Sequence, residues 1–353
     1  MSIRAANQSV KRFLIRVLRT ALGSVEQKPR FEGSLDSIAI LAQEKMGDAI
    51  LLTPLFRNVR RAYPEVKIHV IAMSPIYPFF ESDPHVDVVY RVKQNWIAYL
   101  SRIRNERFDV LFSTKDHPSF SFLLQSRLIK ARFRVGIYHP YHEGFFHHLI
   151  ERDFHQHIVE KNCALLDFLN IPYSREDCRP YLPEEKISDA VKTFVSLTKH
   201  RKCIGINLSA GESNREWPLK KWKAFLAKVK RPVVVFATAD RIADKCILEK
   251  SFDHVISSPQ TRSIREAGEM IRCLGVLVSP DTSLIHVASC TRTRVVGLYK
   301  ADRDHVRRFY PYMIPNRMII SKTNRVEDIP VESVVGAVEE LLKHRALTGM
   351  YFL

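Results

Sequence analysis

Short apolar runs alternate with helical patterns along most of the chain, and this alternation restricts the fold more than any other feature. Runs typical of buried strands lie at residues 37–43, 67–73, 86–92, 109–113, 203–208, 232–237, 254–256, 276–279 and 294–298. Patterns with the period of a helix lie at 54–63, 219–230, 240–250, 263–273, 284–290 and 331–343. Strands that alternate with helices predict the α/β class, with parallel sheets and helices on both faces.

The alternation falls into two series, separated by a segment near 171–190 that contains three prolines. A length of 353 residues is also typical of about two domains. We expect an N-terminal extension at 1–34 and two doubly wound domains, at 35–175 and 176–353, with a cleft between them. Ligands of such sheets bind at the carboxyl ends of the strands and at helix N-termini.

Composition excludes several classes of protein. Hydrophobic residues make up 46% of the chain and charged residues 26%, which is ordinary for a globular protein and excludes a disordered one. No run approaches the ~20 apolar residues that a membrane-spanning helix needs. The six cysteines are scattered and form no CxxC pair, and the first residues contain no continuous apolar segment. These features predict a cytoplasmic protein with reduced thiols.

Positive charge is concentrated at the N-terminus. The formal net charge is +17, and residues 1–30 hold seven Lys and Arg residues against the single acid Glu26. Apolar residues recur there at helical spacing: Val10, Phe13, Leu14, Val17, Leu18, Ala21 and Leu22. The pattern predicts a basic amphipathic helix, which either lies on an anionic membrane surface or docks on its own protein.

A second basic zone covers 51–134, with fourteen Lys and Arg residues against seven Asp and Glu. Such a field favours a polyanionic partner, although a solvated helix face is the commoner explanation for any single residue of the zone. No RRM, KH or helix-turn-helix signature accompanies the charge, so nucleic acid is not an expected partner.

The first of three polar strand-to-helix turns is Glu44-Lys45-Met46-Gly47-Asp48. Gly47 permits a tight turn or the close approach of a ligand. Asp48 follows a predicted strand, where a carboxylate can act as a general base toward a sugar hydroxyl. The alternative is that Asp48 caps a helix.

The second turn covers residues 207–218, NLSAGESNREWP. Its small and polar residues can present backbone N–H groups to a phosphate, and Arg215 can bind phosphate oxygens bidentately. The alternative is a long surface loop whose Trp217 fills the core. Neither GxGxxG nor GxxxxGK[ST] is present, so dinucleotide binding and a P-loop are not supported.

The third turn is Ser279-Pro280-Asp281-Thr282-Ser283-Leu284-Ile285-His286. A buried strand ends at Ser279, and Thr282 and Ser283 open the next helix, where free N–H groups attract phosphate. His286 lies about one turn into that helix and can approach a diphosphate or a sugar. The alternatives are an N-cap role for Asp281 and a satisfied core histidine at position 286.

Taken together, the three turns resemble the heptosyltransferases of glycosyltransferase family 9. The resemblance covers roughly residues 36–345 and rests on MGDAILLTPLFRNVRRAYPEVKIHVI, IGINLSAGESNREWPLKKW and VSPDTSLIHVASCTRTRVVGLY. Members transfer L-glycero-D-manno-heptose from ADP-heptose to the inner core of lipopolysaccharide. The resemblance implies a GT-B fold of two Rossmann-like domains, with the acceptor on the N-terminal domain and the donor on the C-terminal one. It also implies an inverting, metal-independent transfer that needs no cofactor.

Roles can be carried over at matching positions. The resemblance implies that Asp48 is the general base. It implies the following donor-binding residues: Ser209, Ala210, Gly211, Arg215, Asp240, Arg262, Asp281, Thr282, Ser283 and His286. Four basic residues of the N-terminal domain are expected to bind the anionic acceptor: Arg57, Arg60, Arg61 and Lys115.

The chain departs from the family pattern on the donor side. Ala210 and Gly211 stand where some members have hydroxyl residues, Ser283 replaces a usual Gly, and Tyr299-Lys300-Ala301-Asp302-Arg303 replaces a typical FGPTxP. These changes leave two alternatives: a GT-B glycosyltransferase with another nucleotide sugar or acceptor, and a non-catalytic relative.

The expected partners are a nucleotide-sugar donor, a lipopolysaccharide core acceptor and an anionic membrane surface. The protein is accordingly expected to be peripheral on the cytoplasmic face of the inner membrane. A histidine-rich segment, 139–157, is expected to form an acceptor loop with Tyr138, Tyr141 and Phe145, and metal binding there is a weaker alternative.

Overall fold

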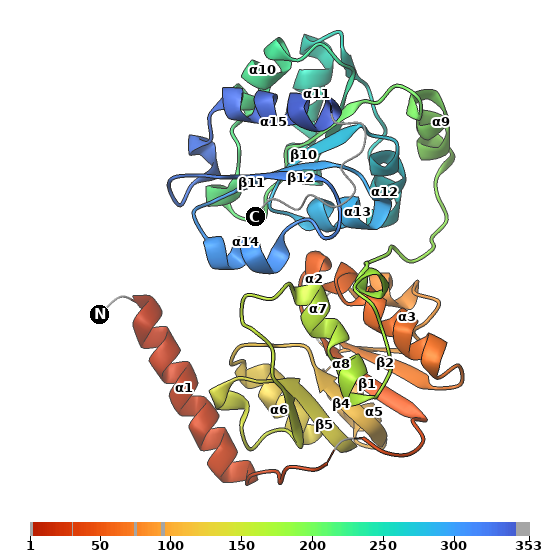
Figure 1. Cartoon of the computed structure of the whole chain (residues 1–353), viewed down its shortest axis with the longest axis vertical. Helices are drawn as coiled ribbons and strands as arrows, with labels where there is room; N and C mark the ends of the chain where they lie inside the picture. Colours follow the sequence, from red (N-terminus) through yellow and green to blue (C-terminus); the bar gives the residue numbers. More distant parts are fainter. Residues whose placement is uncertain (1–2, 30, 74–75, 93–95, 344–353) are drawn as a thin grey trace. The chain divides into compact units, whose positions relative to one another are not determined.

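The computed structural model describes residues 3–29, 31–73, 76–92 and 96–343. The chain divides into two compact units, Met1–Cys178 (unit 1) and Arg179–Leu353 (unit 2), each with its own parallel sheet and helices (Figure 1). The division falls inside the proline-containing segment, and residues 179–188 form no helix or strand.

The sheet of unit 1 has six strands in the order β3-β2-β1-β4-β5-β6, and all pairs are parallel. The strands are β1 Ser37–Ala42, β2 Lys67–Ala72, β3 Val88–Arg91, β4 Phe108–Ser113, β5 Ala131–Ile137 and β6 His148–Ile150. The chain builds outward from β1 to β3 and then returns to place β4 on the other side of β1. The order of the strands therefore reverses between β1 and β4, which is where ligands of open α/β sheets bind.

The sheet of unit 2 repeats this topology in the order β12-β11-β10-β7-β8-β9, again with parallel pairs throughout. Its strands are β7 Ile204–Asn207, β8 Val233–Phe236, β9 Val255–Ile256, β10 Val276–Pro280, β11 Val295–Tyr299 and β12 Asn316–Ile320. Here the reversal lies between β7 and β10.

Helices cover the sheets of both units (Figure 1). Those of unit 1 are α1 Ile3–Leu22, α2 Met46–Ile50, α3 Thr53–Ala62, α4 Tyr77–Glu81, α5 Trp96–Ile103, α6 Phe120–Leu128, α7 Ile158–Cys163 and α8 Leu165–Phe168, with 3-10 turns η1 Pro140–His142 and η2 Glu176–Cys178. Those of unit 2 are α9 Asp189–Thr198, α10 Leu219–Lys228, α11 Ile242–Ser251, α12 Ile264–Arg272, α13 Ser283–Thr291, α14 Arg303–Phe309 and α15 Val331–Lys343, with η3 Ser213–Arg215, η4 Ala239–Arg241 and η5 Val326–Asp328.

The predicted α/β class is confirmed, and each of the nine predicted strand segments contains a strand. Three strands escaped prediction. In β5 the arginines Arg132 and Arg134 interrupt the apolar run, β6 has only three residues, and β12 is a half-buried edge strand. Helix α9 was not predicted; it begins at Asp189, within the last residues of the segment 171–190 that separates the two series.

Aromatic packing fixes the loop before α10 in unit 2. The indole rings of Trp217 and Trp222 meet edge to face, with centroids 4.6 Å apart, and both are fully buried. The Trp217 Nε1–H group donates to the Ile329 carbonyl over 3.1 Å. The alternative in which Trp217 fills the core is therefore confirmed, and it anchors the loop that carries Arg215.

In unit 1 polar bonds fix the ends of β1 and β4. The Thr114 hydroxyl donates to the Leu41 carbonyl over 2.7 Å, and the Gln43 amide donates to the Thr114 carbonyl over 3.1 Å. Asn162, buried on α7, donates from Nδ2 to the Leu51 carbonyl over 2.9 Å, just after α2. This last bond holds the turn between α2 and α3.

We predict that Asn162→Ala destabilises unit 1 by about 1–3 kcal/mol, because it leaves a buried carbonyl without its donor. The matched variant is Asn105→Ala, whose exposed amide donates to the Ser101 carbonyl and whose loss should change stability by less than about 0.5 kcal/mol. Hydrogen exchange of unit 1 peptides in urea measures both. Equal protection in the two variants would contradict this role of Asn162.

Candidate functional site

The strand-end site of unit 1 gathers around Asp48 and Lys115. Asp48 lies in the first turn of α2, whose N-cap is Lys45, so Asp48 is not the helix cap. Lys115 follows β4 and donates from Nζ to the Gln43 Oε1 atom over 3.2 Å. Burial lowers the pKa of Lys115, while the charges of Asp48 and Glu44 act in the opposite direction. A carboxylate and an ammonium group thus share the reversal point of the sheet.

A buried ion pair, Asp116 with Lys161, lies next to this site, because Asp116 directly follows Lys115. Lys161 Nζ lies 2.7 Å from Asp116 Oδ2 and 2.5 Å from the Phe154 carbonyl, and Lys161 and Asp116 are almost fully buried. His117 Nδ1 lies 3.2 Å from the other carboxylate oxygen of Asp116. Sequence reasoning missed Asp116 and Lys161, since 45 residues separate them and neither belongs to a recognisable motif.

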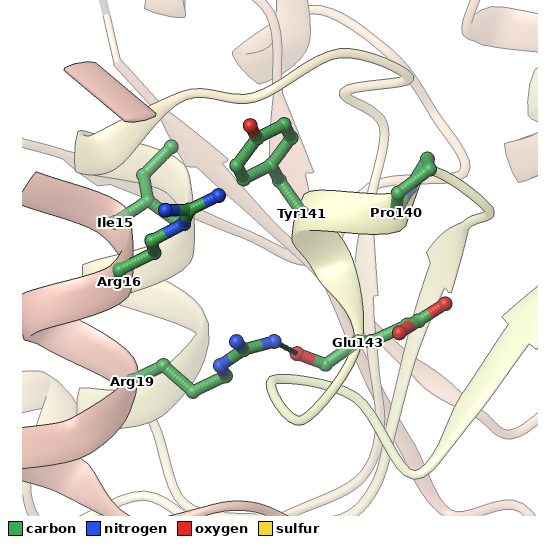
Figure 2. Close-up of a pocket in the computed structure, with 6 residues that line it drawn as sticks. All are labelled: Ile15, Arg16, Arg19, Pro140, Tyr141 and Glu143. Atoms are coloured by element: carbon green, nitrogen blue, oxygen red, sulfur yellow. Dashed lines mark hydrogen bonds between the residues drawn. The ribbon is translucent and has the colours of Figure 1, made fainter. Parts of the chain in front are cut away.

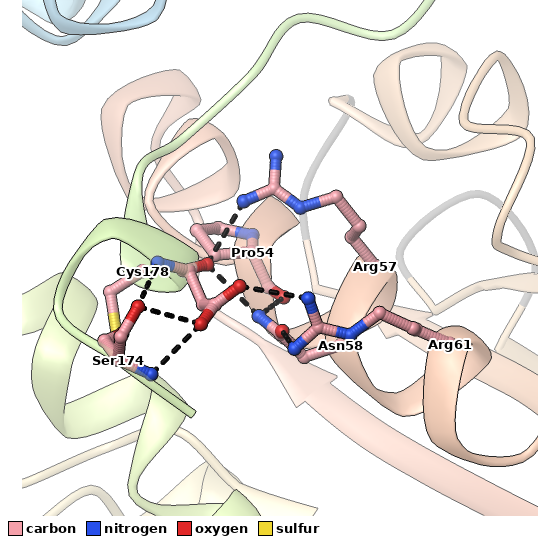
Figure 3. A network of polar contacts seen from close by, with 7 residues as sticks. Pro54, Arg57, Asn58, Arg61, Ser174 and Cys178 are labelled. Carbon is pink, nitrogen blue, oxygen red and sulfur yellow. Dashed lines mark hydrogen bonds and ion pairs between the residues drawn. The ribbon is translucent and has the colours of Figure 1, made fainter. Parts of the chain in front are cut away.

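Two of the arginines expected to bind the acceptor contact the segment 174–178 instead (Figure 3). Arg57 and Asn58 both donate to the Asp177 carbonyl over 2.9 Å, and Arg61 pairs with the Asp177 carboxylate at 2.8 Å. The hydrogen bonds from the backbone and side chain of Ser174, together with Arg61, lower the pKa of Asp177 to about 2. This network ties the end of unit 1 to α3.

Arg60 is also occupied by bonds within unit 1. Its guanidinium donates to the carbonyls of Pro64, Val66 and His85 and pairs with the Asp87 carboxylate at 2.6 Å. Acceptor binding by Arg57, Arg60 and Arg61 stays a prediction. Of the four basic residues in that set, Lys115 is the one beside Asp48.

The histidine-rich segment folds around η1. Phe145 is almost fully buried against Ile15 and Leu123, so its predicted place in an acceptor loop is wrong: the ring fills the core beneath α1. Tyr138 is exposed and Tyr141 is partly buried. His157 caps α7 by accepting a bond from the Val159 N–H group, which is a structural role.

The strand-end site of unit 2 is organised by Asn207, the last residue of β7. Its Nδ2 group donates to the hydroxyl oxygens of Ser279 and Thr282, over 3.0 Å in each case. Thr282 is the N-cap of α13 and accepts from the Leu284 N–H group. The Ser209 hydroxyl bonds to Thr238 at 2.9 Å, beyond the end of β8. Three strand ends are thereby joined by side-chain hydrogen bonds.

Next to this network, the side chains of Arg215 and His305 converge on Asp281. Arg215 Nη1 lies 2.9 Å and His305 Nε2 lies 2.7 Å from the same carboxylate oxygen, Oδ2. Arg215 also lies 3.5 Å from Glu212, and Lys300 lies 3.8 Å from that carboxylate. The two turns singled out in the sequence, around 215 and 281, are thus brought together. His305 was missed because 24 residues separate it from Asp281 and it belongs to no recognisable motif, and Lys300 was noted only as part of the segment that departs from the family pattern.

Burial would raise the pKa of the Asp281 carboxyl, but the hydrogen bond from His305 and the charges of His305 and Arg215 outweigh it and lower that pKa. Burial lowers the pKa of His286 to about 4, so this imidazole is neutral at neutral pH. His286 is only 4% exposed, and its Nδ1 atom has no hydrogen-bond partner among the described residues. It is a core histidine, as the alternative proposed, yet an unsatisfied one.

The other donor-side candidates lie more openly. Ala210, Ser283 and Thr282 are half-buried, whereas Gly211 and Arg262 are exposed. The Arg262 backbone N–H group donates to the Glu266 carboxylate over 2.7 Å. Asp240 lies in η4, where a hydrogen bond from Thr238 lowers the pKa of its carboxyl. Binding by these residues stays a prediction.

Two features of the described part of the chain bear on ligands and membranes. Within it, no three His, Cys, Asp or Glu side chains are grouped so as to hold a metal ion. No helix within it combines the length and the apolarity required to cross a bilayer.

Comparison with known proteins gives consistent matches. The model of glycosyltransferase family 9 (heptosyltransferase) matches residues 96–332, a range that includes the whole strand-end site of unit 2 but not Asp48. The chain is 22% identical over 342 residues to lipopolysaccharide heptosyltransferase 3 of Escherichia coli, covering 85% of this chain and 96% of the relative. It is 21% identical over 285 residues to the lipopolysaccharide core heptosyltransferase OpsX of Haemophilus influenzae, covering 77% of this chain and 81% of the relative.

Among solved structures, E. coli heptosyltransferase WaaC with ADP-2-deoxy-2-fluoro heptose matches with a TM-score of 0.66 and 14% identity. The match covers 86% of this chain and 99% of that one. This likeness confirms the predicted GT-B fold of two Rossmann-like domains.

We predict that His286 makes the stability of unit 2 depend on pH. Below its ordinary pKa near 6.5, the unfolded imidazole takes up a proton that the folded one accepts only near pH 4. The unfolded state then binds more protons, so the free energy of unfolding falls as the pH drops from about 6.5 to about 4, by up to about 3 kcal/mol.

Urea titrations monitored by the fluorescence of the buried Trp217 and Trp222 measure this slope. His286→Gln should remove most of it, and His200→Gln, at an exposed position of the same unit, should leave it as in the wild type. A wild-type slope in His286→Gln would assign the dependence to other groups.

Proposed function

Because the chain belongs to glycosyltransferase family 9, the heptosyltransferases, we propose that it transfers heptose from ADP-heptose to the inner core (Kdo/heptose) of lipopolysaccharide. The proposed transfer inverts the anomeric centre and needs neither a metal ion nor a cofactor. The names of the relatives support the substrates: two are lipopolysaccharide heptosyltransferases, and a matching structure holds an ADP-heptose analogue.

One observation carries the donor half of the proposal. Arg215 pairs with Asp281, which is distant in the sequence and directly precedes Thr282, the N-cap of α13, at the reversal point of the sheet of unit 2. The first-turn N–H groups and the positive end of the helix dipole attract phosphate, and Arg215 adds a guanidinium able to bind two phosphate oxygens.

This arrangement suits the loss of a nucleoside diphosphate. As the bond between the anomeric carbon and the diphosphate breaks, negative charge grows on the leaving phosphate oxygens, and fixed donors stabilise that charge. Asp281 holds Arg215 and His305 in place, because its deprotonated carboxylate accepts from both. Asn207 fixes the Thr282 hydroxyl in the same way.

We assign the acceptor step to Asp48. Its carboxylate takes the proton of the attacking hydroxyl, so that a neutral acceptor oxygen does not have to carry a positive charge after it bonds to the sugar. Lys115 is half-buried beside it and offers an ammonium group to an anionic acceptor.

We further propose that the enzyme works on the cytoplasmic face of the inner membrane as a peripheral protein. Its acceptor is a lipid held in that membrane, and the strongly basic N-terminal thirty residues suit an anionic bilayer. Helix α1 is docked on unit 1 through Ile15, and it still exposes apolar residues, so docking and membrane contact are compatible.

The first test is a calorimetric titration with ADP-heptose, ADP-mannose and UDP-glucose, together with turnover on a lipopolysaccharide core acceptor. We expect binding of ADP-heptose and transfer of its sugar. Asp48→Asn should keep donor binding and lose about 10²- to 10⁴-fold in turnover, the usual contribution of a general base. Glu65→Gln, which removes an exposed carboxylate of the same unit away from the site, is the matched control and should remain active.

Selective binding of UDP-glucose would indicate a transferase that uses another nucleotide sugar. The departures from the family pattern at Ala210 and Gly211 favour this second candidate. Absence of any donor binding would indicate a non-catalytic relative. Full activity of Asp48→Asn would remove the base from the mechanism while leaving the donor assignment intact.

Arg215→Ala should weaken ADP binding by roughly 10- to 100-fold, as expected for loss of a charged hydrogen bond to phosphate. Adenosine carries no phosphate, so its binding should stay as in the wild type. Arg231→Ala, which removes an exposed arginine of the same unit, is the control. If ADP and adenosine lose affinity in parallel, Arg215 acts on the fold of the loop rather than on the diphosphate.

A further inference from the structure

We propose that a pocket between α1 and η1 binds the phosphate headgroup of an anionic bilayer lipid, while the apolar stripe Phe13, Leu14 and Val17 of α1 inserts beside it. This inference rests on the proposed peripheral location and names the surface and the ligand chemistry that would produce it. The occupant is a phosphate carried by a lipid in a membrane.

The C-terminal half of α1 is held firmly on unit 1. Ile15 is 2% exposed and packs against Leu123, Phe145 and Phe146, with Leu18 at the edge of the same cluster. The Arg127 guanidinium donates to the Leu22 carbonyl at the end of the helix over 2.5 Å. The following segment continues the attachment, because the Val25 and Lys28 N–H groups donate to the carbonyls of Gly144 and His147 over 2.9 and 3.0 Å.

A different face of the same helix is apolar and uncovered. Phe13 is 65% exposed, Val17 48% and Leu14 42%, and at 100° per residue these three side chains fall within one stripe. Ile15 lies about 100° from the nearer edge of that stripe, so docking on unit 1 does not cover it. A helix that merely docked on its own unit would need only the Ile15 face.

The pocket lies beside the helix and has a volume of about 300 Å³. Figure 2 shows Arg16 extending from α1 toward Tyr141 of η1, and Arg19 extending toward the Glu143 backbone. This size is at the lower end of ligand pockets, which is adequate for a headgroup rather than for a whole lipid. Two guanidinium groups and a phenol are suitable donors for phosphate oxygens.

The cations of the pocket are poorly neutralised by the protein. Arg19 donates to the Glu143 backbone carbonyl at a long 3.5 Å, and the Glu143 carboxylate accepts from the Tyr138 hydroxyl at 3.3 Å. In the part of the chain that the structure describes, the Arg16 guanidinium has neither a hydrogen bond nor an ion pair, and Arg12 lies over the Tyr141 ring at 5.6 Å. Open cations beside an apolar stripe match an anionic bilayer in both charge and polarity.

Ring and charge contacts connect Tyr141 of the pocket with residues next to Lys115. The Tyr141 ring stacks on His139 with centroids 5.7 Å apart, and His139 lies within electrostatic range of His117 and Asp116. His117 Nδ1 lies 3.2 Å from Oδ1 of Asp116, and Asp116 directly follows Lys115 in the sequence.

The apolar stripe decides between a lipid and a free anion. Inorganic phosphate or a soluble nucleotide would use Arg16 and Arg19 but would leave Phe13 and Val17 in water. A bilayer uses both features at once, since the headgroups meet the arginines and the acyl boundary accepts the apolar side chains.

The test is flotation of the full-length protein with vesicles of equal parts phosphatidylglycerol and phosphatidylcholine, and with vesicles of phosphatidylcholine alone. We expect binding to the anionic vesicles only. Arg16→Ala/Arg19→Ala should weaken it by roughly 25-fold, about fivefold per basic residue at an anionic surface. Lys230→Ala/Arg231→Ala removes the same charge from exposed positions of unit 2 and should bind as the wild type.

Phe13→Ser/Val17→Ser should also lose at least tenfold in vesicle binding. Its matched control is Ile97→Ser/Leu197→Ser, since these side chains are 80% and 72% exposed. Both test variants should keep the wild-type circular dichroism and the wild-type affinity for ADP-heptose.

Wild-type vesicle binding by either test variant overturns the inference. Loss of vesicle binding in the Lys230→Ala/Arg231→Ala control as well would mean that binding depends only on the net charge of the protein. Saturable binding of inorganic phosphate to the pocket, without any vesicle binding, would mean that the ligand is a free anion and not a lipid. Flotation needs no turnover, so a failure of the proposed heptosyl transfer shows only in the donor titration and leaves this result readable.

Discussion

Parallel pairing of β1 with β4 and of β7 with β10 is the constraint on which the rest of the structure depends. In each sheet the chain leaves the central strand to one side and later returns to the other, so the two following loops diverge and leave room at the strand ends. Asp48 and Lys115 occupy this position in unit 1, and Asn207 and Asp281 occupy it in unit 2. The polar side chains of both sites are therefore concentrated at the strand ends, where backbone N–H groups have no neighbouring strand to bond to.

Charge at these positions is tolerated because it is paired. In unit 1 the nearly inaccessible carboxylate of Asp116 is matched by Lys161, and in unit 2 Asp281 is matched by Arg215 and His305. An unpaired ion at such depth would be strongly destabilising. These pairs therefore hold the loops in place: one oxygen of Asp281 fixes both the Arg215 guanidinium and the His305 imidazole.

The sequence was sufficient for the strands with uninterrupted apolar runs and for the three motif-bearing turns, because apolar periodicity and strand-end polarity are local signals. It failed for β5, where Arg132 and Arg134 alternate with apolar residues, and for β12 at the sheet edge. It also missed His305 and the Asp116–Lys161 pair, since contacts over long separations leave no local pattern. Asp48 was found by its motif, whereas its neighbour Lys115 was found only as one cation among many.

Counting charge could not separate the roles of the basic residues, and geometry does. Arg57, Arg60 and Arg61 belong to the zone with the larger excess of cations, yet carbonyls and carboxylates of unit 1 occupy them. Arg16 lies in the extension and has no such partner within the described residues. A cation that already donates to the protein loses part of that interaction when it binds a phosphate, whereas an open one beside an apolar stripe gains the whole of it. The surface that meets an anionic bilayer is therefore set by where arginines remain open, and not by where they are most numerous.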